Sequence, residues 1–400
     1  MDMRFLDSAD IRSYVQEHAS EAEILLKDLA VIPAPSGKEC RRADFCRKWL
    51  EARGCREVYV DDAGNVIYPY QARCREKLLA LMAHMDVVFE DDEYLQIRQK
   101  DRKLTGPGVG DDTANLANLM MTAAYFAEKQ PELQTGILFI MDTCEEGMGN
   151  LKGCRRIMTD FGDRLQAVIA LDLYQGDYYT TFVGSCRWEI KVVTEGGHSY
   201  MDFGKASAVE QISRIICRLY EQKLPDAGSG HAGDQQSDAD SQPAATYNVG
   251  LISGGTSVNT IAQEAKALYE IRSVSAAALA FMKDQFLHII DDFRKDGLNI
   301  DLQLVGERPC AGNPNRQVMD MLGSIARDII EEETGLQAHK GSISSDSNIP
   351  VSMGIPSITL GTIIGGGAHT RQEWVDLDSQ RAGISMVLHM ISRVCRCFFQ

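Results

Sequence analysis

Short, almost continuous apolar runs are the most regular feature of this sequence. The four clearest are Leu78–Ala83, Ile137–Met141, Ala167–Leu171 and Ser357–Leu360. Runs of this length without a polar face are typical of strands buried on both sides. Residues 11–30, 39–53 and 113–128 instead have apolar positions at helical spacing, and Ser36-Gly37-Lys38-Glu39 has the pattern of a capping box. The alternation predicts an α/β fold with a mixed, mostly parallel sheet flanked by helices.

A different order of elements occupies the middle of the chain. Strand, helix, strand, strand, helix and strand patterns cover residues 188–194, 206–221, 246–253, 265–273, 276–293 and 300–305. This β-α-β-β-α-β order is that of a ferredoxin-like unit. Buried-strand and helix patterns like those of the first part of the chain resume near residue 316. We therefore expect an inserted α+β domain of residues 185–306 within a discontinuous domain of residues 1–184 and 307–400. Residues 225–245 are polar and aperiodic, which predicts a surface loop.

The amino-acid composition argues against two classes of binding partner, nucleic acids and membranes. The 400 residues include 57 Asp and Glu against 41 Lys and Arg, a net charge of −16. Such an excess repels phosphate backbones and anionic lipid surfaces, so we expect no nucleic-acid or membrane partner. No apolar run approaches the length of about 18 residues that a spanning helix needs. The 11 cysteines are odd in number and lack C-x-x-C spacing, which favours reduced thiols and a cytoplasmic protein.

Side chains that bind metals follow each of the predicted buried strands. In chain order these segments are His84-Met85-Asp86, Asp142-Thr143-Cys144-Glu145-Glu146, Asp172 and, after a glycine-rich stretch, His369. The carboxyl ends of parallel strands meet at one edge of a sheet, so these groups should converge. Singly, each is as well explained by a structural pair or a solvated turn. Their combination predicts a cation site.

The segment Gly106-Pro107-Gly108-Val109-Gly110-Asp111-Asp112 directly precedes a predicted helix. One interpretation is a turn that brings Asp111 against a metal at the helix N-terminus, where negative charge is favoured. The alternatives are a phosphate-binding loop, or a plain turn with Asp112 as the N-cap. A dinucleotide-binding loop would have a third glycine where Asp111 stands, so the sequence disfavours that reading.

These motifs resemble those of the M20 metallopeptidases. The resemblance extends from Ile32 to Thr370 and is most specific at the motifs Ala83-His84-Met85-Asp86, Gly106-x-Gly108-x-x-Asp111-Asp112, Glu145-Glu146-Gly147 and Gly196-Gly197-His198-Ser199. It implies a two-zinc catalytic domain and an inserted lid domain through which the chain forms a homodimer.

The resemblance also implies a role for each acid and imidazole of the strand ends. Asp111 would bridge two divalent ions, with His84 and Asp172 completing the first site. Glu146 and His369 would complete the second site. Zinc is the commonest ion for such ligands, and Co²⁺ or Mn²⁺ also suits them. Asp86 would accept the other ring N–H of His84.

Glu145 is left without a metal, and we predict that it is the general base and acid of amide hydrolysis. In the inserted domain, His198 would stabilise the oxyanion, typically in the neighbouring subunit's active site. Asn259 and Arg272 match positions that contact substrate in relatives. Their alternatives are an ordinary turn asparagine and an arginine on a strand face, and His198 could be an ordinary loop histidine.

Asp172 stands where deacylase relatives usually carry Glu, which by resemblance favours the peptidase T and dipeptidase branch. We therefore expect a metal-dependent exopeptidase, an aminopeptidase acting on small peptides. One alternative is an N-acyl-amino-acid amidohydrolase with the same metals. An alternative of another class is a non-catalytic dimeric binding protein.

Overall fold

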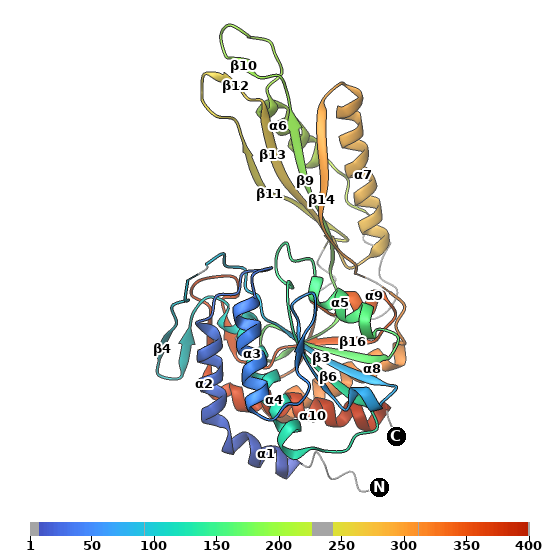
Figure 1. Cartoon of the computed structure of the whole chain (residues 1–400). Helices are drawn as coiled ribbons and strands as arrows, with labels where there is room; N and C mark the ends of the chain where they lie inside the picture. The colour runs from blue at the N-terminus through green and yellow to red at the C-terminus, as the bar shows by residue number, and fades with distance from the viewer. Residues whose placement is uncertain (1–7, 92, 226–242, 311, 399–400) are drawn as a thin grey trace. The chain divides into compact units, whose positions relative to one another are not determined.

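The computed structural model describes residues 8–398 except residue 92, residues 226–242 and residue 311. The chain divides into two compact units, coloured along the sequence in Figure 1. Unit 1 comprises Met1–Thr180 and Gly312–Gln400, and unit 2 comprises Thr181–Ala311. Unit 2 extends a few residues beyond each end of the expected insert, 185–306. Most of the predicted surface loop, 225–245, lies outside the described residues.

An eight-stranded sheet forms the centre of unit 1, in the order β1-β2-β6-β3-β7-β16-β8-β15. Its strands are β1 (Tyr59–Val60), β2 (Val66–Tyr70), β3 (Leu78–His84), β6 (Gly136–Asp142), β7 (Leu165–Leu171), β8 (Asp177–Phe182), β15 (His339–Ile343) and β16 (Ser357–Leu360). The central strands β6, β3, β7 and β16 are parallel, whereas β1, β2 and β8 pair antiparallel with their neighbours. These four central strands are the four apolar runs, so the predicted fold class is confirmed.

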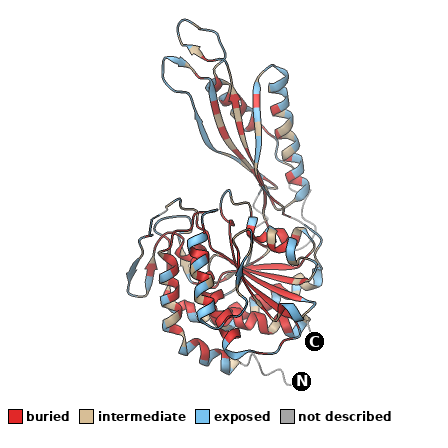
Figure 2. Ribbon diagram, in the orientation of Figure 1, coloured by how far each residue is buried: buried red, intermediate tan, exposed pale blue. Residues whose placement is uncertain are grey.

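Helices cover both faces of this sheet. They are α1 (Ser8–Glu17), α2 (Ala19–Ala30), α3 (Cys40–Ala52), α4 (Asn115–Lys129), α5 (Lys152–Phe161), α8 (Arg316–Thr334), α9 (Asn348–Ser352) and α10 (Gln380–Phe398). Leu79 and Leu81 of β3 belong to a core shared with α1 to α4, α8 and α10, whereas Ala80 and Met82 pack with α5 and α9. Burial on both sides, red in Figure 2, explains why these strands have no polar face.

Two local details of unit 1 differ from the sequence prediction. Residues 11–30 are helical as predicted, but they belong to two helices that are separated at His18, whose backbone is not helical (φ −102°, ψ 9°). The capping box of Ser36 and Glu39 does not form, because α3 begins at Cys40 with Glu39 as its N-cap residue, and the Glu39 side chain does not cap the helix. Ser36 Oγ donates to the Asp86 carboxylate, and Glu39 Oε1 accepts from the backbone N–H of Cys144.

A smaller sheet and three short helical turns complete the described part of unit 1. The sheet has the order β17-β18-β5-β4, with β17 (Gly365–Gly366), β18 (Trp374–Asp376), β5 (Lys103–Thr105) and β4 (Arg98–Lys100). The turns are η1 (Ala72–Cys74), η2 (Val109–Ala114) and η4 (Leu377–Ser379). In the described part of the chain, no helix combines the length and the apolar composition required to cross a bilayer.

Unit 2 has the predicted ferredoxin-like order. Its elements are β9 (Gly184–Val193), α6 (Ala208–Leu219), β11 (Thr246–Gly254), β13 (Glu264–Ser273), α7 (Ala276–Lys295) and β14 (Asn299–Arg308). The sheet order is β11-β13-β9-β14, antiparallel throughout. Alternate residues of β9 and β13 pack under the two helices in a core around Trp188, Tyr269 and Phe286, visible as bands in Figure 2. Two further short strands pair antiparallel with each other. They are β10 (Gly197–His198), which follows β9 in the chain, and β12 (Thr260–Ile261), which precedes β13.

Candidate active site

The candidate site lies at the carboxyl ends of the parallel strands β3, β6 and β7. His84 is the last residue of β3, Glu145 and Glu146 follow β6, and Asp172 follows β7. Three groups of side chains have possible ligand atoms within 4.8 Å of one another: Asp111, Glu146 and His369; His84, Glu145 and Glu146; and His84, Asp112 and Asp172. The structure thus brings together the six strand-end and loop residues that the sequence singles out for metal binding and proton transfer.

Asp111 lies between the two histidines. Its Oδ1 is 3.2 Å from His84 Nε2, and its Oδ2 is 3.2 Å from His369 Nε2. His369 Nε2 also lies 3.1 Å from Glu146 Oε1. One carboxylate therefore presents each of its oxygens to a different histidine, which is the arrangement required of a ligand shared by two ions.

The Asp86 carboxylate holds the two glutamates through their backbone. Its oxygens accept the N–H groups of Glu145 at 3.0 Å and Glu146 at 2.9 Å, and the hydroxyl of Ser36 at 2.6 Å. Asp86 is fully buried, and its two contacts with backbone N–H groups are buried with it, whereas the Ser36 contact is partly buried. Asp86 therefore fixes where the Glu145–Glu146 turn sits.

The ring of His84 is oriented by the backbone more closely than by the predicted carboxylate. His84 Nδ1 lies 3.0 Å from the carbonyl oxygen of Asp86, and 3.6 Å from Asp86 Oδ1. A carbonyl can only accept, so this contact places a proton on Nδ1. Nε2, which faces Asp111, is then the nitrogen that can bind a cation.

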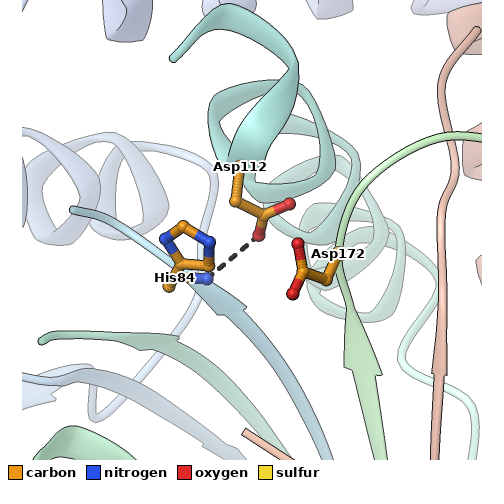
Figure 3. A group of neighbouring side chains, drawn as sticks. All are labelled: His84, Asp112 and Asp172. Carbon is orange, nitrogen blue, oxygen red and sulfur yellow. Dashed lines mark hydrogen bonds between the residues drawn. The ribbon is translucent and has the colours of Figure 1, made fainter. Parts of the chain in front are cut away.

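Asp112 was expected only as a possible N-cap, but α4 begins at Asn115 and Asp112 faces the metal-ligand cluster instead. Asp112 Oδ2 accepts the backbone N–H of His84 at 3.0 Å, drawn as the dashed line in Figure 3, and Oδ1 accepts from Asn115 Nδ2 at 2.6 Å. Figure 3 also shows the Asp112 carboxylate between His84 and Asp172. Asp112 therefore fixes the end of β3 beside the site.

Burial and mutual charge perturb the titration of these groups. Burial, reinforced by the charge of Asp111, raises the pKa of Glu146 to about 7, and the same two causes raise the pKa of Asp172 well above its usual value. Hydrogen bonds to Asp111 and Glu146 raise the pKa of His369 to about 11. Burial would raise the pKa of Asp111, but its contacts with His369 and His84 outweigh burial and lower it.

The donor set suits divalent cations. Asp111, Glu146 and Asp172 are buried, and among the described residues no lysine or arginine forms an ion pair with them. Protonated histidines are the positive charges that this cluster offers its carboxylates. Buried anions need a compensating charge, and imidazole with carboxylate oxygens is a common ligand set for Zn²⁺. His84, Asp111, Glu146, Asp172 and His369 could therefore hold metal.

The glycine-rich loop binds a carboxylate of its own chain. Glu373 accepts the N–H groups of Gly108 at 2.8 Å, Gly110 at 3.0 Å and Asp111 at 2.6 Å. These are the donors that a phosphate-binding loop would offer to its ligand. The phosphate alternative is therefore not supported for this loop.

In unit 2, the structure brings together two of the three predicted residues. His198 and Asn259 are exposed and lie on adjoining segments, joined by a 3.0 Å hydrogen bond from Ser199 N to the Asn259 carbonyl. Arg272 lies near the far end of β13, where it is paired with Ser185 of β9. Its Nε donates to Glu270 Oε1 at 2.6 Å, so part of its charge is engaged within the sheet.

The sequence pattern of peptidase family M20/M25/M40 matches residues 80–393, from just before His84 to beyond His369. This chain belongs to that family. It is therefore a hydrolase of the class that cleaves amide bonds. The convergence of His84, Asp111 and His369 lies within the matched region.

Individual proteins of similar sequence or fold carry different names. A probable succinyl-diaminopimelate desuccinylase from Staphylococcus aureus (strain MSSA476) is 23% identical over 280 residues, covering 64% of this chain and 68% of that protein. A tripeptidase structure from Staphylococcus aureus subsp. aureus Mu50 has a TM-score of 0.69 at 21% identity, covering 94% of this chain and 99% of the other. A dipeptidase structure from Saccharomyces cerevisiae has a TM-score of 0.76 at 14% identity, covering 98% and 99%. At such identities these structures show a shared fold.

Sequence reasoning missed three residues that support the site of this M20-family chain. Ser36 was assigned to a helix cap, and Glu39 with it, although both reach the Asp86 to Glu146 region. Glu373 was not singled out at all. The one signal available in the sequence was its position four residues after His369. That position indicates a role only when the contacts of Glu373 with the loop from Gly108 to Asp111 are known.

Proposed function

We propose that this chain is a two-metal exopeptidase that removes residues from short peptides. The single observation that carries the proposal is the position of Asp111, whose two carboxylate oxygens each lie 3.2 Å from a different histidine. Two cations bound on either side of Asp111 would use His84 and Asp172 at one site, and Glu146 and His369 at the other. Zinc is our first choice for both, with Co²⁺ and Mn²⁺ as ions of overlapping ligand preference.

The cations, when bound, would polarise the scissile carbonyl and make water acidic enough to attack it at neutral pH. Glu145 is the residue we assign to proton transfer. It is buried, it lies in the same cluster as His84 and Glu146, and its backbone is anchored on Asp86. As general base it would take a proton from the attacking water, and as general acid it would return that proton to the leaving amine.

Glu145 and Glu146 can hold separate roles although they are neighbours. The Asp86 oxygens accept both of their N–H groups, so the turn is fixed from behind while the two side chains remain available. Glu146 Oε1 faces His369 at 3.1 Å, which assigns it to the second ion. The Asp86 carboxylate accepts the N–H groups of both glutamates, and its backbone carbonyl faces His84 Nδ1, so we propose Asp86 as a positioning residue.

Unit 2 would complete the site as a lid. His198 is exposed on a two-residue strand, with Asn259 beside it, so both could meet a substrate or a second chain. We propose that His198 stabilises the oxyanion and that Asn259 and Arg272 contact the substrate. Strand β11 is an edge strand with Leu251 and Ile252 more than half exposed, which supports a homodimer formed through unit 2.

Two substrate classes are candidates: free peptides and N-acyl amino acids. The tripeptidase and dipeptidase structures of similar fold support free peptides, as does Asp172 in place of the deacylases' usual Glu. The desuccinylase relative supports the second candidate, an N-acyl-amino-acid amidohydrolase. The third alternative, a non-catalytic dimeric binding protein, would be expected to have lost the base or a ligand, whereas all six residues are present.

A panel of substrates separates these candidates. The full-length protein, supplied with zinc or cobalt, is incubated with dipeptides, tripeptides, and N-acetylated and N-succinylated amino acids, and free amino acids are quantified. We expect turnover of peptides that carry a free N-terminus. Turnover of the acylated amino acids alone would contradict the peptidase assignment, and purified protein that binds no divalent ion would revive the binding-protein alternative.

A further inference from the structure

The carboxylate of Glu373 is the acceptor for an entire loop. Glu373 is fully buried and directly precedes β18, whose pairing with β5 brings it beside the glycine-rich segment. Its Oε2 accepts the N–H of Gly108, and its Oε1 accepts those of Gly110 and Asp111, at distances between 2.6 and 3.0 Å. The backbone of Glu373 takes part as well, since its carbonyl accepts the N–H of Gly106 at 2.9 Å.

Two glycines of this loop leave no room for a side chain. A Cβ on Gly110 would lie 2.9 Å from Glu373 Oε1 and 2.7 Å from a ring carbon of Tyr174. Gly108 has a φ of +65°, and a Cβ there would lie 2.3 Å from Val87 Cγ1. A side chain at Gly110 would separate the loop from Glu373, and one at Gly108 would push the loop away from Val87. These two glycines therefore let the loop lie close to the Glu373 carboxyl group.

Tyr174 links the same carboxylate to another segment of the site. Its hydroxyl donates to Glu373 Oε1 at 3.2 Å, and it stands two residues after Asp172. Gly361 and Gly365 leave the space for Tyr174, because a Cβ on either would lie 2.1 to 2.6 Å from its atoms. Glu373 itself stands four residues after His369. The segments that carry Asp111 and Asp172 therefore both contact the Glu373 carboxylate, which belongs to the segment that carries His369.

We propose that Glu373 is a positioning residue that holds Asp111 with its two oxygens toward His84 and His369, and that it thereby sets the affinity of the site for divalent cations. The proposal rests on the proposed two-metal function. Without the carboxylate, three buried N–H groups would have no acceptor, and the loop would move to regain partners. Asp111 would move with it, because its own N–H makes the shortest of these contacts.

The test measures metal binding directly, by calorimetric titration of the metal-free full-length protein with Co²⁺ and by the visible absorption of the bound cobalt. In Glu373→Gln, the side chain keeps its volume and one carbonyl oxygen but presents an NH₂ group in place of the other acceptor. We expect the cobalt affinity of at least one site to fall about 10- to 100-fold, with an altered spectrum. Glu373→Gln that binds two cobalt ions with unchanged affinity and spectrum would overturn the proposal.

A second variant covers the case in which Glu373→Gln does not fold. Tyr174→Phe removes one donor to the carboxylate and leaves the carboxylate in place, and we expect a smaller but measurable loss of cobalt affinity. Tyr70→Phe is the matched control, because it removes a buried hydroxyl that donates to the Pro131 carbonyl away from the site. If Glu373→Gln does not fold, equal cobalt affinity in Tyr174→Phe and Tyr70→Phe would overturn the proposal.

These outcomes are separable from failure of the proposed function. Wild-type protein that binds two cobalt ions but cleaves no peptide would contradict the substrate assignment and leave the role of Glu373 to be decided by the variants. Wild-type protein that binds no divalent cation would contradict both.

Discussion

The two units carry their candidate functional groups in opposite physical settings. In unit 1 the acids and His84 of the cluster are buried, and Asp86, Asp112 and Asp111 each accept hydrogen bonds or face histidines. In unit 2, His198 and Asn259 are exposed, beside apolar side chains that are also exposed, namely Tyr200, Met201, Phe203 and Val258. A buried charged cluster has to be assembled by folding. Exposed groups gain a role only when a substrate or another chain reaches them.

The largest effect should come from the interior cluster. Glu145→Gln removes the proposed base while retaining the shape of the side chain, so we expect kcat to fall by about 10²- to 10⁴-fold with unchanged metal content. Steady-state kinetics and metal analysis of the purified variant measure both quantities. Glu132→Gln is the control, since Glu132 is 90% exposed in unit 1. Full activity of Glu145→Gln would refute the assignment.

The exposed group of unit 2 should affect rate without affecting stability. Loss of one oxyanion donor lowers kcat by about 10²- to 10³-fold, so we expect a fall of that order for His198→Gln. Its free energy of unfolding should stay within about 0.5 kcal/mol of wild type, because the side chain is exposed. His288→Gln, an exposed histidine on α7, is the control for urea unfolding and kinetics. Equal kcat in the two variants would mean that unit 2 supplies no oxyanion donor.

The smallest effect concerns a buried acid of unit 1 outside the cluster. Neither oxygen of Asp142 meets an N–H or O–H donor among the described residues. Burial, with the charge of Asp346 next in size, raises the pKa of Asp142 well above its usual value. In the unfolded chain the pKa of Asp142 is about 3.9, its reference value. Stability therefore falls as pH rises above that value, since the folded chain holds the proton longer.

Asp142→Asn removes this titration and keeps the size and shape of the side chain. We expect the variant to be more stable than wild type at about pH 8, and the difference to shrink at about pH 5. Thermal unfolding of both proteins at the two pH values measures it, and Asp163→Asn on the surface serves as the comparison. The same stability difference at both pH values would show that Asp142 does not titrate between them.

The sequence predicts the central sheet well because burial on both faces leaves an unbroken apolar run, as in Leu78–Ala83. It also predicts that strand-end side chains converge, because parallel strands end at one edge of a sheet. Ser36 was misassigned because a local capping pattern competes with a buried acceptor 50 residues away. Glu373 could not be found, since the loop residues whose N–H groups it accepts lie more than 260 residues away, and backbone N–H groups leave no sequence signal.

The central claim is that two divalent cations share Asp111, and metal stoichiometry tests it most directly. The full-length protein is equilibrated with zinc, freed of excess ion, and analysed for metal per chain, alongside Asp111→Asn. We expect two zinc ions per chain in the wild type and loss of tight binding at both sites in the variant. A wild type that retains one ion or none, or an Asp111→Asn variant that retains two, would contradict it.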